Sequence, residues 1–568
     1  MGFWRKFFES FFGGFKLWRK SKTHTSLMEA LRTRLVFAGI CCVFVYSCVS
    51  YRLADSMIIS KFCRKCDLNS SCSEVVQKLD IVDRNGEILA TSIPTASCFA
   101  DPSVIIDIYE TAKRMAKIAC FPNVEKIKKR LSNKGKHFVW LARHISPKIK
   151  QEILDMGLPG IHFLKDYKRI YTHGNLFSHV IGCSDIDGNG VCGIEKKFSK
   201  WLTKKESSDK SLALSLDLKL QSIIHEELTD AINKFGALGG NAILMKTNGE
   251  ILAMVSLPDF DPNNLKDTNS ETMFNRCTLG VCEQGSVMKI LNAAIALEEG
   301  TAKPGSIFNA SEPIRLGRFV INDFRGKHRP LSLVETVVYS SNIASVKIAQ
   351  TFGPAVQKKY MKRFGLLDKP PLEIQEVGAP LYHKHWTEAT SMTVSYGYGL
   401  SVSSLQMLSA VTSIVAGGMK VPPTLLLNSN GSRENIRIVS AATSAVIRDL
   451  MRAVVLYGTG KKADIEGVSV FAKTGTAYKL KKSGYGNDGN RERLTTFIGG
   501  FPKDKPQFML LISIDNPKAS QETYGYATAG WNVVPTAKNI LSRIVPLLID
   551  CSEITESELK VAKYISGR

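Results

Sequence analysis

The most informative stretch of the chain is GSVMKILNAAIAL, residues 285–297. It predicts an apolar helix that ends at Gly300. Ser286 stands at the start of this helix, where free backbone N–H groups and the helix dipole favour developing negative charge. Lys289 lies on the same helix face because it follows three residues later. The spacing indicates a serine nucleophile with a lysine beside it.

A serine with a lysine three residues later occurs three times in the chain, at Ser207, Ser286 and Ser557. Only Ser286 opens a strongly apolar helix, which is the rigid support that a reactive side chain needs. The other two serines lie in highly charged stretches. Taken alone, Ser286 is more simply explained as an N-cap serine, so the assignment depends on further motifs.

Two further motifs follow. Ser340-Ser341-Asn342 comes 54 residues after Ser286, behind an apolar segment. Lys473-Thr474-Gly475-Thr476 comes at the end of an expected apolar strand, residues 468–472. Such a strand places a cation and hydroxyl groups along the edge of a cleft, and its glycine lets a substrate backbone lie close. A similar triplet, Lys482-Ser483-Gly484, lies in a polar stretch and is interpreted as a loop.

The segments around the motifs predict an α+β fold. A hairpin is expected over residues 240–256, after a helix over residues 218–235. Helical segments then continue to about residue 460, and two strands are expected at 494–500 and 508–514. One sheet therefore begins before a helical block and is completed after it.

Residues 78–209 predict a separate zone of short strands and helices. IVDRNGEIL, residues 81–89, predicts a hairpin with an Asn-Gly turn. Residues 124–156 have a helical composition, and the charged, serine-rich residues 204–210 suit a linker.

Together, in this order, the three motifs resemble those of the class B penicillin-binding proteins, and most closely the division-specific FtsI type. The resemblance covers roughly residues 78–545. It extends to the stretches DRNG (83–86), LPGIH (158–162), RIY (169–171), HVIG (179–182), GIEK (193–196), WLT (201–203) and SYGYGL (395–400). It implies a β-lactamase-like transpeptidase domain, with a central antiparallel sheet and a helical block. This domain would stand on an elongated mixed α/β pedestal, preceded by one transmembrane helix.

The chain departs from the family pattern at four places. Lys78-Leu79 stands where the family has Arg-Gly, and Thr172 stands where it has proline. Gln284 and Ile290 replace prolines on either side of the serine motif. These changes concern the pedestal contacts and the approach to the serine helix, and they leave the catalytic groups intact.

The resemblance implies acyl transfer on peptidoglycan stem peptides, with β-lactams as inhibitors. Ser286 would attack the penultimate D-alanine, and burial together with the charge of Lys473 would keep Lys289 neutral as the base.

Ser340 would relay a proton to the leaving amine, and Asn342 would hold the substrate amide. The N–H groups of Ser286 and Thr476 would form the oxyanion hole. The terminal carboxylate would be bound by Lys473, Thr474 and Thr476, beside Gly475. Neither a cofactor nor a metal is required.

The N-terminal region predicts a membrane anchor. Residues 35–51 are uncharged, and a helix of this length reaches roughly 26 Å, which suffices to cross a bilayer. The basic cluster before it predicts a cytoplasmic N-terminus, with the catalytic domain on the periplasmic side of the bacterial inner membrane. A cleaved signal peptide, a buried core helix and a lipoprotein cysteine at Cys48 are the alternatives. No Ala-x-Ala site follows the stretch.

Composition and net charge limit the class of protein and the kind of partner. The chain has 568 residues with ordinary hydrophobic content, which excludes wholesale disorder, and only one long apolar run, which excludes a multi-span protein. Its net charge of +23 favours an anionic environment such as a membrane surface or an acidic polymer, and no nucleic-acid-binding motif is present. By resemblance, the partners are a SEDS-family glycosyltransferase and other membrane proteins of the divisome.

These patterns predict that the chain is divided into six parts. They are a basic and aromatic cytoplasmic tail (1–34), the transmembrane anchor (35–51), a juxtamembrane segment (52–77), the pedestal (78–209), the transpeptidase domain (210–548) and a C-terminal tail (549–568).

Thirteen cysteines leave the redox chemistry open. Cys63, Cys66 and Cys72 cluster after the apolar run, and Cys183 and Cys192 form a near pair. Disulfides and a zinc site are both possible in principle, but the zinc site has no identifiable fourth ligand and no pairing is predicted.

Three other functions share parts of this pattern. A serine β-lactamase or β-lactam sensor has the same motifs, but it seldom carries such a pedestal and needs a base for deacylation. An elongation-type transpeptidase more often has Asp at the position of Asn342. A catalytically silent scaffold would not need the complete set of catalytic groups found here.

Overall fold

The computed structural model describes residues 27–54, 77–118, 120–121, 123–203, 211–317, 319–427, 436–479, 491–549 and 562–565. The chain divides into two units, Met1–Val75 and Val76–Arg568. Several predictions fall outside the described residues: most of the N-terminal tail, the cysteines at 63, 66 and 72, the linker at 204–210, the loop at 482–484 and most of the C-terminal tail. The six domain limits remain predictions.

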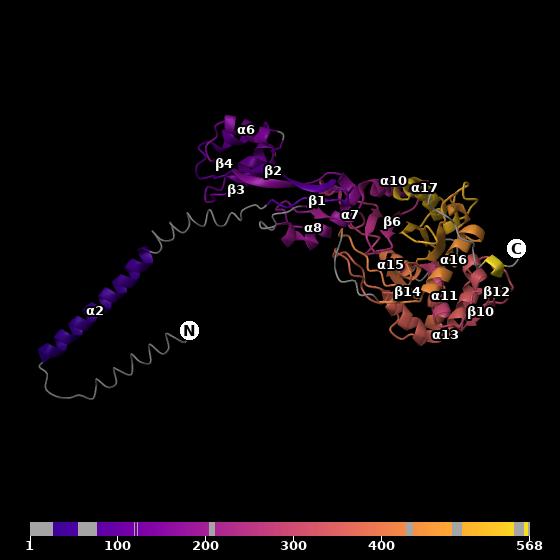
Figure 1. Ribbon diagram of the computed structural model, residues 1–568. Helices are drawn as coiled ribbons and strands as arrows, with labels where there is room; N and C mark the ends of the chain where they lie inside the picture. The colour runs from indigo at the N-terminus through magenta and orange to yellow at the C-terminus, as the bar shows by residue number, and fades with distance from the viewer. Residues whose placement is uncertain are drawn as a thin grey trace. The chain divides into compact units, whose positions relative to one another are not determined.

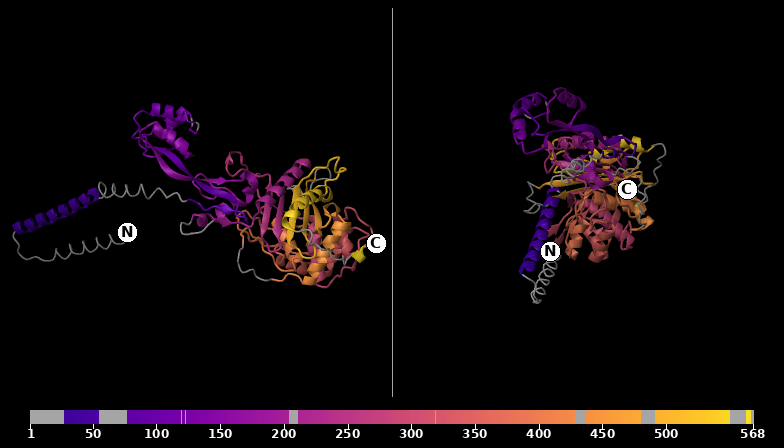
Figure 2. Two further views of the ribbon diagram at one scale, coloured as in Figure 1. Left: turned by 45° about the horizontal axis from the view of Figure 1, so that its top comes forward. Right: turned by 90° about the vertical axis from the view of Figure 1, so that its left-hand side faces the viewer.

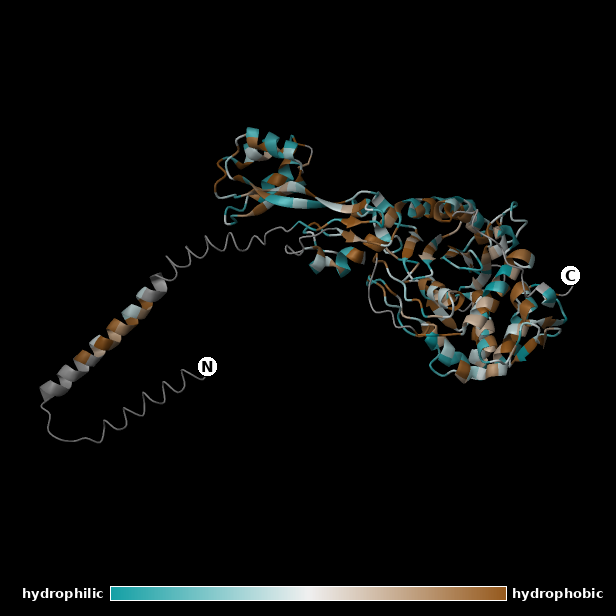
Figure 3. Cartoon of the chain, viewed as in Figure 1, coloured by the Kyte–Doolittle hydropathy of each residue, from teal (hydrophilic) through white to brown (hydrophobic). Residues whose placement is uncertain are grey.

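The first unit contains one described helix, α2 (Leu27–Ala54). It includes the whole predicted range 35–51, so the expected helix is confirmed. Large apolar side chains of this helix, Val36 and Phe44 among them, are exposed. The middle of the helix includes hydrophobic stretches (Figure 3). Across the described part of the chain, no helix is both long enough and apolar enough to cross a membrane. The transmembrane assignment of residues 35–51 is therefore not confirmed.

The second unit begins with the pedestal sheet. Its strands are β1 (Ile81–Val82), β2 (Ile88–Ala100), β3 (Val139–Ile145), β4 (Ile161–Tyr171) and β5 (Leu212–Ala213). The order is β3-β2-β1-β5, and β4 also pairs with β2. The predicted hairpin is confirmed, because β1 and β2 are antiparallel and Gly86 takes a φ of +89° in the turn between them. The longest pairing joins β2 and β4 from Ala90↔Tyr171 to Ala100↔Ile161.

The predicted helical run over residues 124–156 is wrong in its middle. Helices α5 (Val124–Leu131) and α6 (Pro147–Asp155) are present, but strand β3 separates them. Leu141 and Ile145 of β3 are buried, and the strand pairs with β2. A distant strand thus overrides the local composition of this segment. The other pedestal helices are α4 (Ile108–Met115), α7 (Ser178–Ile181), α8 (Gly193–Lys197) and α9 (Ser199–Leu202).

The second sheet confirms the predicted α+β layout. Its strands are β6 (Gly239–Lys246), β7 (Ile251–Leu257), β15 (Phe471–Tyr478), β16 (Arg493–Phe501) and β17 (Phe508–Asp515). They are antiparallel throughout, in the order β15-β16-β17-β6-β7. The hairpin at 240–256 forms β6 and β7, and the strands expected at 494–500 and 508–514 are β16 and β17. The order places β15 at one edge of the sheet.

Helices cover both faces of this sheet (Figures 1 and 2). Alternate residues of β6 point to opposite faces: Ala242 and Leu244 enter one core cluster, and Ile243 and Met245 enter another. The first cluster holds the apolar faces of α10 (Leu218–Lys234) and α17 (Val533–Leu548). The second holds α11 (Met288–Glu298), α15 (Ser404–Val415) and α16 (Ala441–Tyr457).

The remaining elements of the helical block lie between β7 and β15 in the chain. The helices are α12 (Leu333–Tyr339), α13 (Asn342–Arg363) and α14 (Glu388–Ser395). The short strands are β8 (Val281–Glu283), β9 (Ile307–Asn309), β10 (Ile314–Leu316), β11 (Phe319–Ile321), β12 (Pro330–Ser332), β13 (Leu381–Tyr382) and β14 (Leu400–Ser403). The candidate site lies where the edge strand β15 meets the start of α11 and the turn between α12 and α13.

Candidate active site

Ser286 lies in a 3₁₀ turn, Gly285–Val287, that leads directly into α11. The predicted helix is confirmed, but the serine precedes its first α-helical residue. Residues 288–296 of α11 are buried, so the helix is held on all sides by the core. A nucleophile at the start of such a helix is fixed in position by its support.

Three glycines let separate backbone segments meet around Ser286. A Cβ on Gly397 would lie 1.9 Å from the carbonyl oxygen of Gly285, and one on Gly285 would lie 2.8 Å from that of Thr476. A Cβ on Gly475 would lie 2.7 Å from the carbonyl oxygen of Gln284. A side chain at Gly285 or Gly475 would therefore push the serine turn and β15 apart, and one at Gly397 would push the serine turn away from the segment between α14 and β14.

Lys289 joins the first two motifs through its side-chain nitrogen. Its Nζ lies 3.1 Å from Ser286 Oγ, 3.2 Å from Ser340 Oγ and 2.7 Å from Asn342 Oδ1. The side chain is buried, with 1% of its surface exposed. Burial, reinforced by the charge of Lys473, holds the pKa of Lys289 well below its usual value, and Asp323 partly opposes this shift. This lysine can therefore accept a proton from Ser286.

The second motif occupies a tight turn between two helices. Ser340 takes a left-handed conformation (φ 61°) at the end of α12, and Ser341 caps the start of α13. Asp323, which follows β11, holds this turn in place. Its carboxylate accepts hydrogen bonds from Ser341 Oγ (2.6 Å), Asn342 N (2.5 Å) and Ile343 N (3.1 Å).

Asp323 was missed by the sequence analysis. It lies 18 residues before Ser341 and belongs to none of the three motifs, so its role becomes visible only when β11 and α13 are brought together. The one sequence signal was its place in a polar stretch just before the apolar segment that leads to Ser340.

Lys473 lies inside strand β15, which corrects the prediction that the third motif ends a strand at 472. The strand begins at Phe471 and runs through the motif because every residue of it pairs with β16. Lys473 Nζ lies 3.0 Å from Ser340 Oγ and 2.9 Å from the carbonyl oxygen of Thr474. Burial lowers the pKa of Lys473 to about 7. Ser340 Oγ thus lies between the two lysine side chains.

The three motifs surround one cleft of about 430 Å³. Ser286, Ser340, Asn342, Thr474, Gly475 and Thr476 all line it, whereas Lys289 and Lys473 are buried and do not. Thr476 Oγ1 accepts a hydrogen bond from Ala529 N, and Thr474 Oγ1 contacts Thr459 Oγ1. The structure therefore brings every predicted site residue together.

The walls of the cleft contain groups that the motifs did not predict. Arg325, Lys461, Lys462 and Arg493 make the lining strongly basic, and among the described lining residues Asp323 is the only carboxylate. Tyr396, Tyr398 and Trp531 add aromatic surface. Such a cleft suits an extended peptide that ends in a carboxylate. Within the described residues, no group of three or more His, Cys, Asp or Glu side chains is arranged to hold a metal ion.

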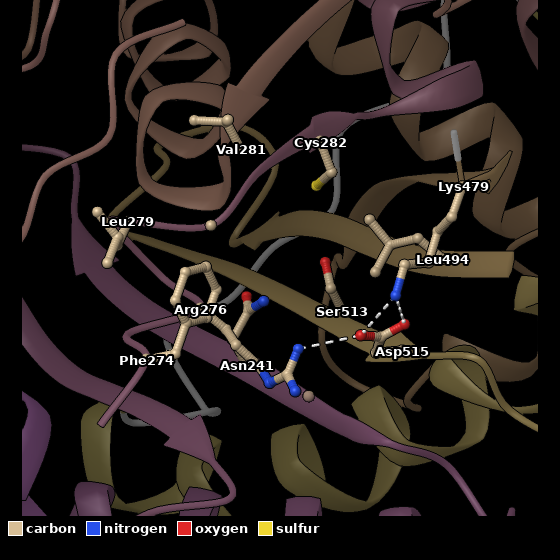
Figure 4. Close-up of a pocket in the computed structure, with 12 residues that line it drawn as sticks. Asn241, Phe274, Arg276, Leu279, Val281, Cys282, Lys479, Leu494, Ser513 and Asp515 are labelled. Carbon is tan, nitrogen blue, oxygen red and sulfur yellow. Dashed lines mark hydrogen bonds and ion pairs between the residues drawn. The ribbon is translucent and has the colours of Figure 1, made fainter. Parts of the chain in front are cut away.

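A second cavity, of about 510 Å³, lies beside the segments that carry the site (Figure 4). In it the side chains of Lys479 and Arg276 converge on Asp515, at 2.8 and 3.0 Å. Lys479 follows β15, and Arg276 precedes β8, which leads to Ser286. Asp515 is 6% exposed, so this ion cluster links the strand of the third motif to the segment before the nucleophile.

Three of the four departures from the family pattern are accommodated, whereas Gln284 leaves its buried Oε1 without a hydrogen-bond partner among the described residues. Lys78 Nζ donates to Glu195 Oε2 at 2.7 Å, while Arg169 Nε donates to Glu195 Oε1 at 2.6 Å, so a buried cation is retained at position 78.

The other departures make contacts of a different kind. Thr172 Oγ1 donates to the carbonyl oxygen of Ile88. Gln284 Nε2 donates to the carbonyl oxygen of Val402 at 3.1 Å, and Ile290 is buried in the core.

Comparisons with known proteins agree with this geometry. The penicillin-binding protein transpeptidase domain matches residues 240–542, and the penicillin-binding protein dimerisation domain matches residues 79–210. A Caulobacter vibrioides protein described as a probable peptidoglycan D,D-transpeptidase FtsI is 32% identical over 481 residues, which cover 83% of this chain and 81% of that protein. The peptidoglycan D,D-transpeptidase FtsI of Escherichia coli K12 is 30% identical over 483 residues, 79% of this chain and 81% of its own.

Solved structures share the fold. Penicillin-binding protein 3 of Mycobacterium tuberculosis, solved with aztreonam, matches with a TM-score of 0.64 and 23% identity, covering 83% of this chain and 96% of that chain. A peptidoglycan synthetase of Bifidobacterium adolescentis matches with a TM-score of 0.66 and 19% identity, covering 85% of this chain and 97% of that chain. The matched domains and the identity over most of the chain establish that it belongs to the class B penicillin-binding proteins, among the FtsI-type peptidoglycan D,D-transpeptidases.

Proposed function

We propose that the protein cross-links peptidoglycan stem peptides through an acyl-enzyme on Ser286 during septal cell-wall synthesis. The observation that carries the proposal is the position of Lys289 Nζ, within hydrogen-bond distance of Ser286, Ser340 and Asn342. A buried lysine with a lowered pKa in this position is a base beside a nucleophile, as covalent acyl transfer needs.

The first half of the reaction forms the ester. Neutral Lys289 takes the proton of Ser286 Oγ as this oxygen attacks the carbonyl carbon of the penultimate D-alanine. The N–H groups of Ser286 and Thr476 stabilise the oxyanion. Asn342 holds the substrate amide, and Lys473, Thr474 and Thr476 bind the terminal carboxylate.

Collapse of the tetrahedral intermediate completes this first half: Ser340 passes a proton from Lys289 to the departing D-alanine amine, the C–N bond breaks and the ester remains. The place of Ser340 Oγ between both lysines supports this relay. In the second half the acyl group is transferred. The amine of a second stem peptide then attacks the ester. The attacking amine gives up a proton to Lys289, the ester bond breaks as the new amide bond forms, and a proton passes from Lys289 to Ser286 Oγ.

β-Lactams enter the same first step, because their strained amide acylates Ser286. The ester then persists if no base activates water. Asp323, the only carboxylate among the described residues of the cleft, is engaged by the turn at 341–343, which disfavours a β-lactamase. Asn342 at the third position of the second motif favours the division type over the elongation type.

We further propose that residues 35–51 anchor the protein in the inner membrane, with the catalytic domain in the periplasm. Support comes from the uncharged sequence of this stretch, its helical state and its exposed apolar side chains. The partners are a SEDS-family glycosyltransferase and other division membrane proteins. The pedestal (78–209) and the transpeptidase domain (210–548) would work as separate domains.

A fluorescent penicillin, followed over time, tests the reaction. The wild-type protein is expected to become labelled and to lose the label slowly, and Ser286→Ala should remain unlabelled. Ser207→Ala is the matched control, because Ser207 has the same lysine spacing and should be dispensable. Labelling of Ser286→Ala would place the nucleophile elsewhere, and rapid loss of label by the wild type would favour a β-lactamase.

A further inference from the structure

Two cysteines meet at the base of a short loop in the pedestal. The Sγ atoms of Cys183 and Cys192 lie 3.5 Å apart. Cys183 is buried, whereas Cys192 is partly exposed and can be reached from solvent. Among the described cysteines, no other two are in hydrogen-bond contact. The contact is therefore specific to this loop.

The backbone around the pair is already held in position. Val191 N donates to the carbonyl oxygen of Cys183 at 2.8 Å, and Ser184 and Gly190 form an antiparallel bridge. Gly182 lies so close that a Cβ on it would be 2.0 Å from the carbonyl oxygen of Cys192. The sulfur atoms, 3.5 Å apart, therefore need to close only part of that distance to reach the roughly 2 Å of a disulfide, in a loop whose main chain already pairs across the two cysteines.

The tip of the loop is fixed as well. Asp185 Oδ1 accepts hydrogen bonds from the N–H groups of Asp187 and Asn189 at 2.9 and 2.8 Å. Arg143 on β3 binds Asp187 at 2.9 Å. A loop with so little freedom presents its two cysteines together in the folded protein.

We propose that Cys183 and Cys192 form a structural disulfide, which makes this loop an oxidative modification site of the pedestal. The proposal rests on the proposed periplasmic location, because disulfides form and persist in oxidising compartments. The oxidant is another disulfide, carried by a small molecule or by a thiol–disulfide oxidoreductase.

The exchange balances in two steps. The accessible Cys192 loses its proton and attacks one sulfur of the oxidant, forming a mixed disulfide and releasing one thiol. Cys183 then loses its proton and attacks Cys192 Sγ, which forms the new bond and releases the second thiol. Two protons and two electrons pass from the protein to the oxidant.

The bond would stabilise the joint between the pedestal and the transpeptidase domain. Gly193, which follows Cys192, donates its N–H to Glu376 of the helical block at 3.2 Å. Ser184, which follows Cys183, donates to Glu195, the buried partner of Lys78 and Arg169. Neither cysteine lines the cleft of Ser286, so the disulfide should leave acylation unchanged.

The full-length protein, purified from cells without reductant and also treated with glutathione disulfide, provides the test. After alkylation of free thiols under denaturing conditions and digestion, mass spectrometry should find the Cys183 and Cys192 peptides joined, at roughly 2 Da below the sum of their masses. Cys277 and Cys282, which are in no disulfide contact, should be alkylated and serve as internal controls. In Cys192→Ser the peptide containing Cys183 should be alkylated instead.

Stability gives a second measurement. Reduction should lower the unfolding temperature of the wild type by roughly 5 °C, and it should have no effect on the Cys183→Ser/Cys192→Ser protein. Penicillin labelling should proceed at the same rate in all samples, which separates this proposal from that of the catalytic function. Alkylation of both cysteines in the protein from cells, or an unfolding temperature that reduction does not change, would overturn the proposal.

Discussion

Lys289 and Lys473 have opposite tasks although both are buried and both contact Ser340. Lys289 must be neutral to accept a proton, and Lys473 must be charged to bind a carboxylate. The pKa of Lys289 lies well below its usual value, and that of Lys473 is about 7. The productive form of the free protein therefore exists only over a limited range of pH.

A bell-shaped pH profile should result. The rate constant for acylation by penicillin should rise as Lys289 loses its proton and fall above about pH 7, as Lys473 loses its own. Lys473→Arg should remove the fall, because a guanidinium stays protonated, although its different shape should lower the maximum. Lys473→Ala should lower the acylation rate constant by roughly 100-fold below pH 7, where Lys473 of the wild type is charged, and by less above it. A fall above pH 7 that persists in Lys473→Arg would remove Lys473 from this role.

Asp323 acts on the same site through the second motif. Its carboxylate holds the start of α13, where negative charge is also favoured by the helix dipole. The same charge raises the pKa of Lys289. A variant at this position should therefore change both the placement of Asn342 and the proton affinity of the base.

Asp323→Asn should slow acylation by about tenfold, because an amide replaces charged hydrogen bonds to the turn. It should also move the acidic limb of the pH profile to lower pH, since loss of the negative charge lowers the pKa of Lys289 further. Glu312→Gln, which removes an exposed carboxylate ahead of β10, is the control and should match the wild type. An unchanged acidic limb in Asp323→Asn would show that its charge does not reach Lys289.

The sequence predicts the reactive residues better than it predicts what holds them. Ser286, Lys289, Ser340, Asn342 and Lys473 belong to compact motifs, whose order and context single them out. Asp323 is a lone acidic residue in a polar stretch, and only the packing of β11 against α13 gives it a partner. Supporting residues of this kind are set by tertiary contacts that no local pattern encodes.

At the scale of elements, the cleft depends on how closely β15 and the serine turn approach. Gly397 makes this possible from a third segment, between α14 and β14, with a φ of +107°. A Cβ on Gly397 would lie 1.9 Å from the carbonyl oxygen of Gly285, so a residue with a side chain would collide there. The position of Ser286 is therefore sensitive to a residue more than a hundred positions away.

Gly397→Ala should strongly reduce penicillin labelling, by roughly 100-fold or more, because the methyl group would displace Gly285 and with it Ser286. Gly417→Ala is the matched control: Gly417 also has a positive φ, of +81°, but a Cβ there meets nothing within 4 Å. Backbone strain should be comparable in both variants, so circular dichroism and labelling together separate strain from the collision. Equal labelling of the two variants would contradict this explanation.

Elements were predictable where their pattern is local. The hairpin of β6 and β7 and the strands β16 and β17 follow from apolar runs and turn residues. Strand β3 was mistaken for helix because lysine-rich, helix-forming segments flank it, and its strand state depends on pairing with β2. The same non-local pairing, with β16, carries β15 through the third motif.

At the scale of the whole molecule, the net charge and the uncharged N-terminal stretch bear on the proposed membrane attachment. The chain carries a net charge of +23, which favours association with an anionic surface or polymer. Catalysis on the cell wall also requires that the cleft be held near its substrate. The proposed membrane attachment and the acylation of Ser286 should therefore be separable by experiment.

A protein that starts at residue 52 should still bind fluorescent penicillin at the wild-type rate, because every group of the cleft lies in the unit Val76–Arg568. It should nevertheless fail to support septation in cells depleted of the wild-type protein, since it lacks the proposed anchor. Replacement of residues 35–51 by an unrelated apolar helix of equal length separates tethering from specific contact with the proposed glycosyltransferase partner. Full rescue by this exchange would mean that the helix only tethers, whereas rescue at wild-type level by the shortened protein would refute any need for membrane attachment.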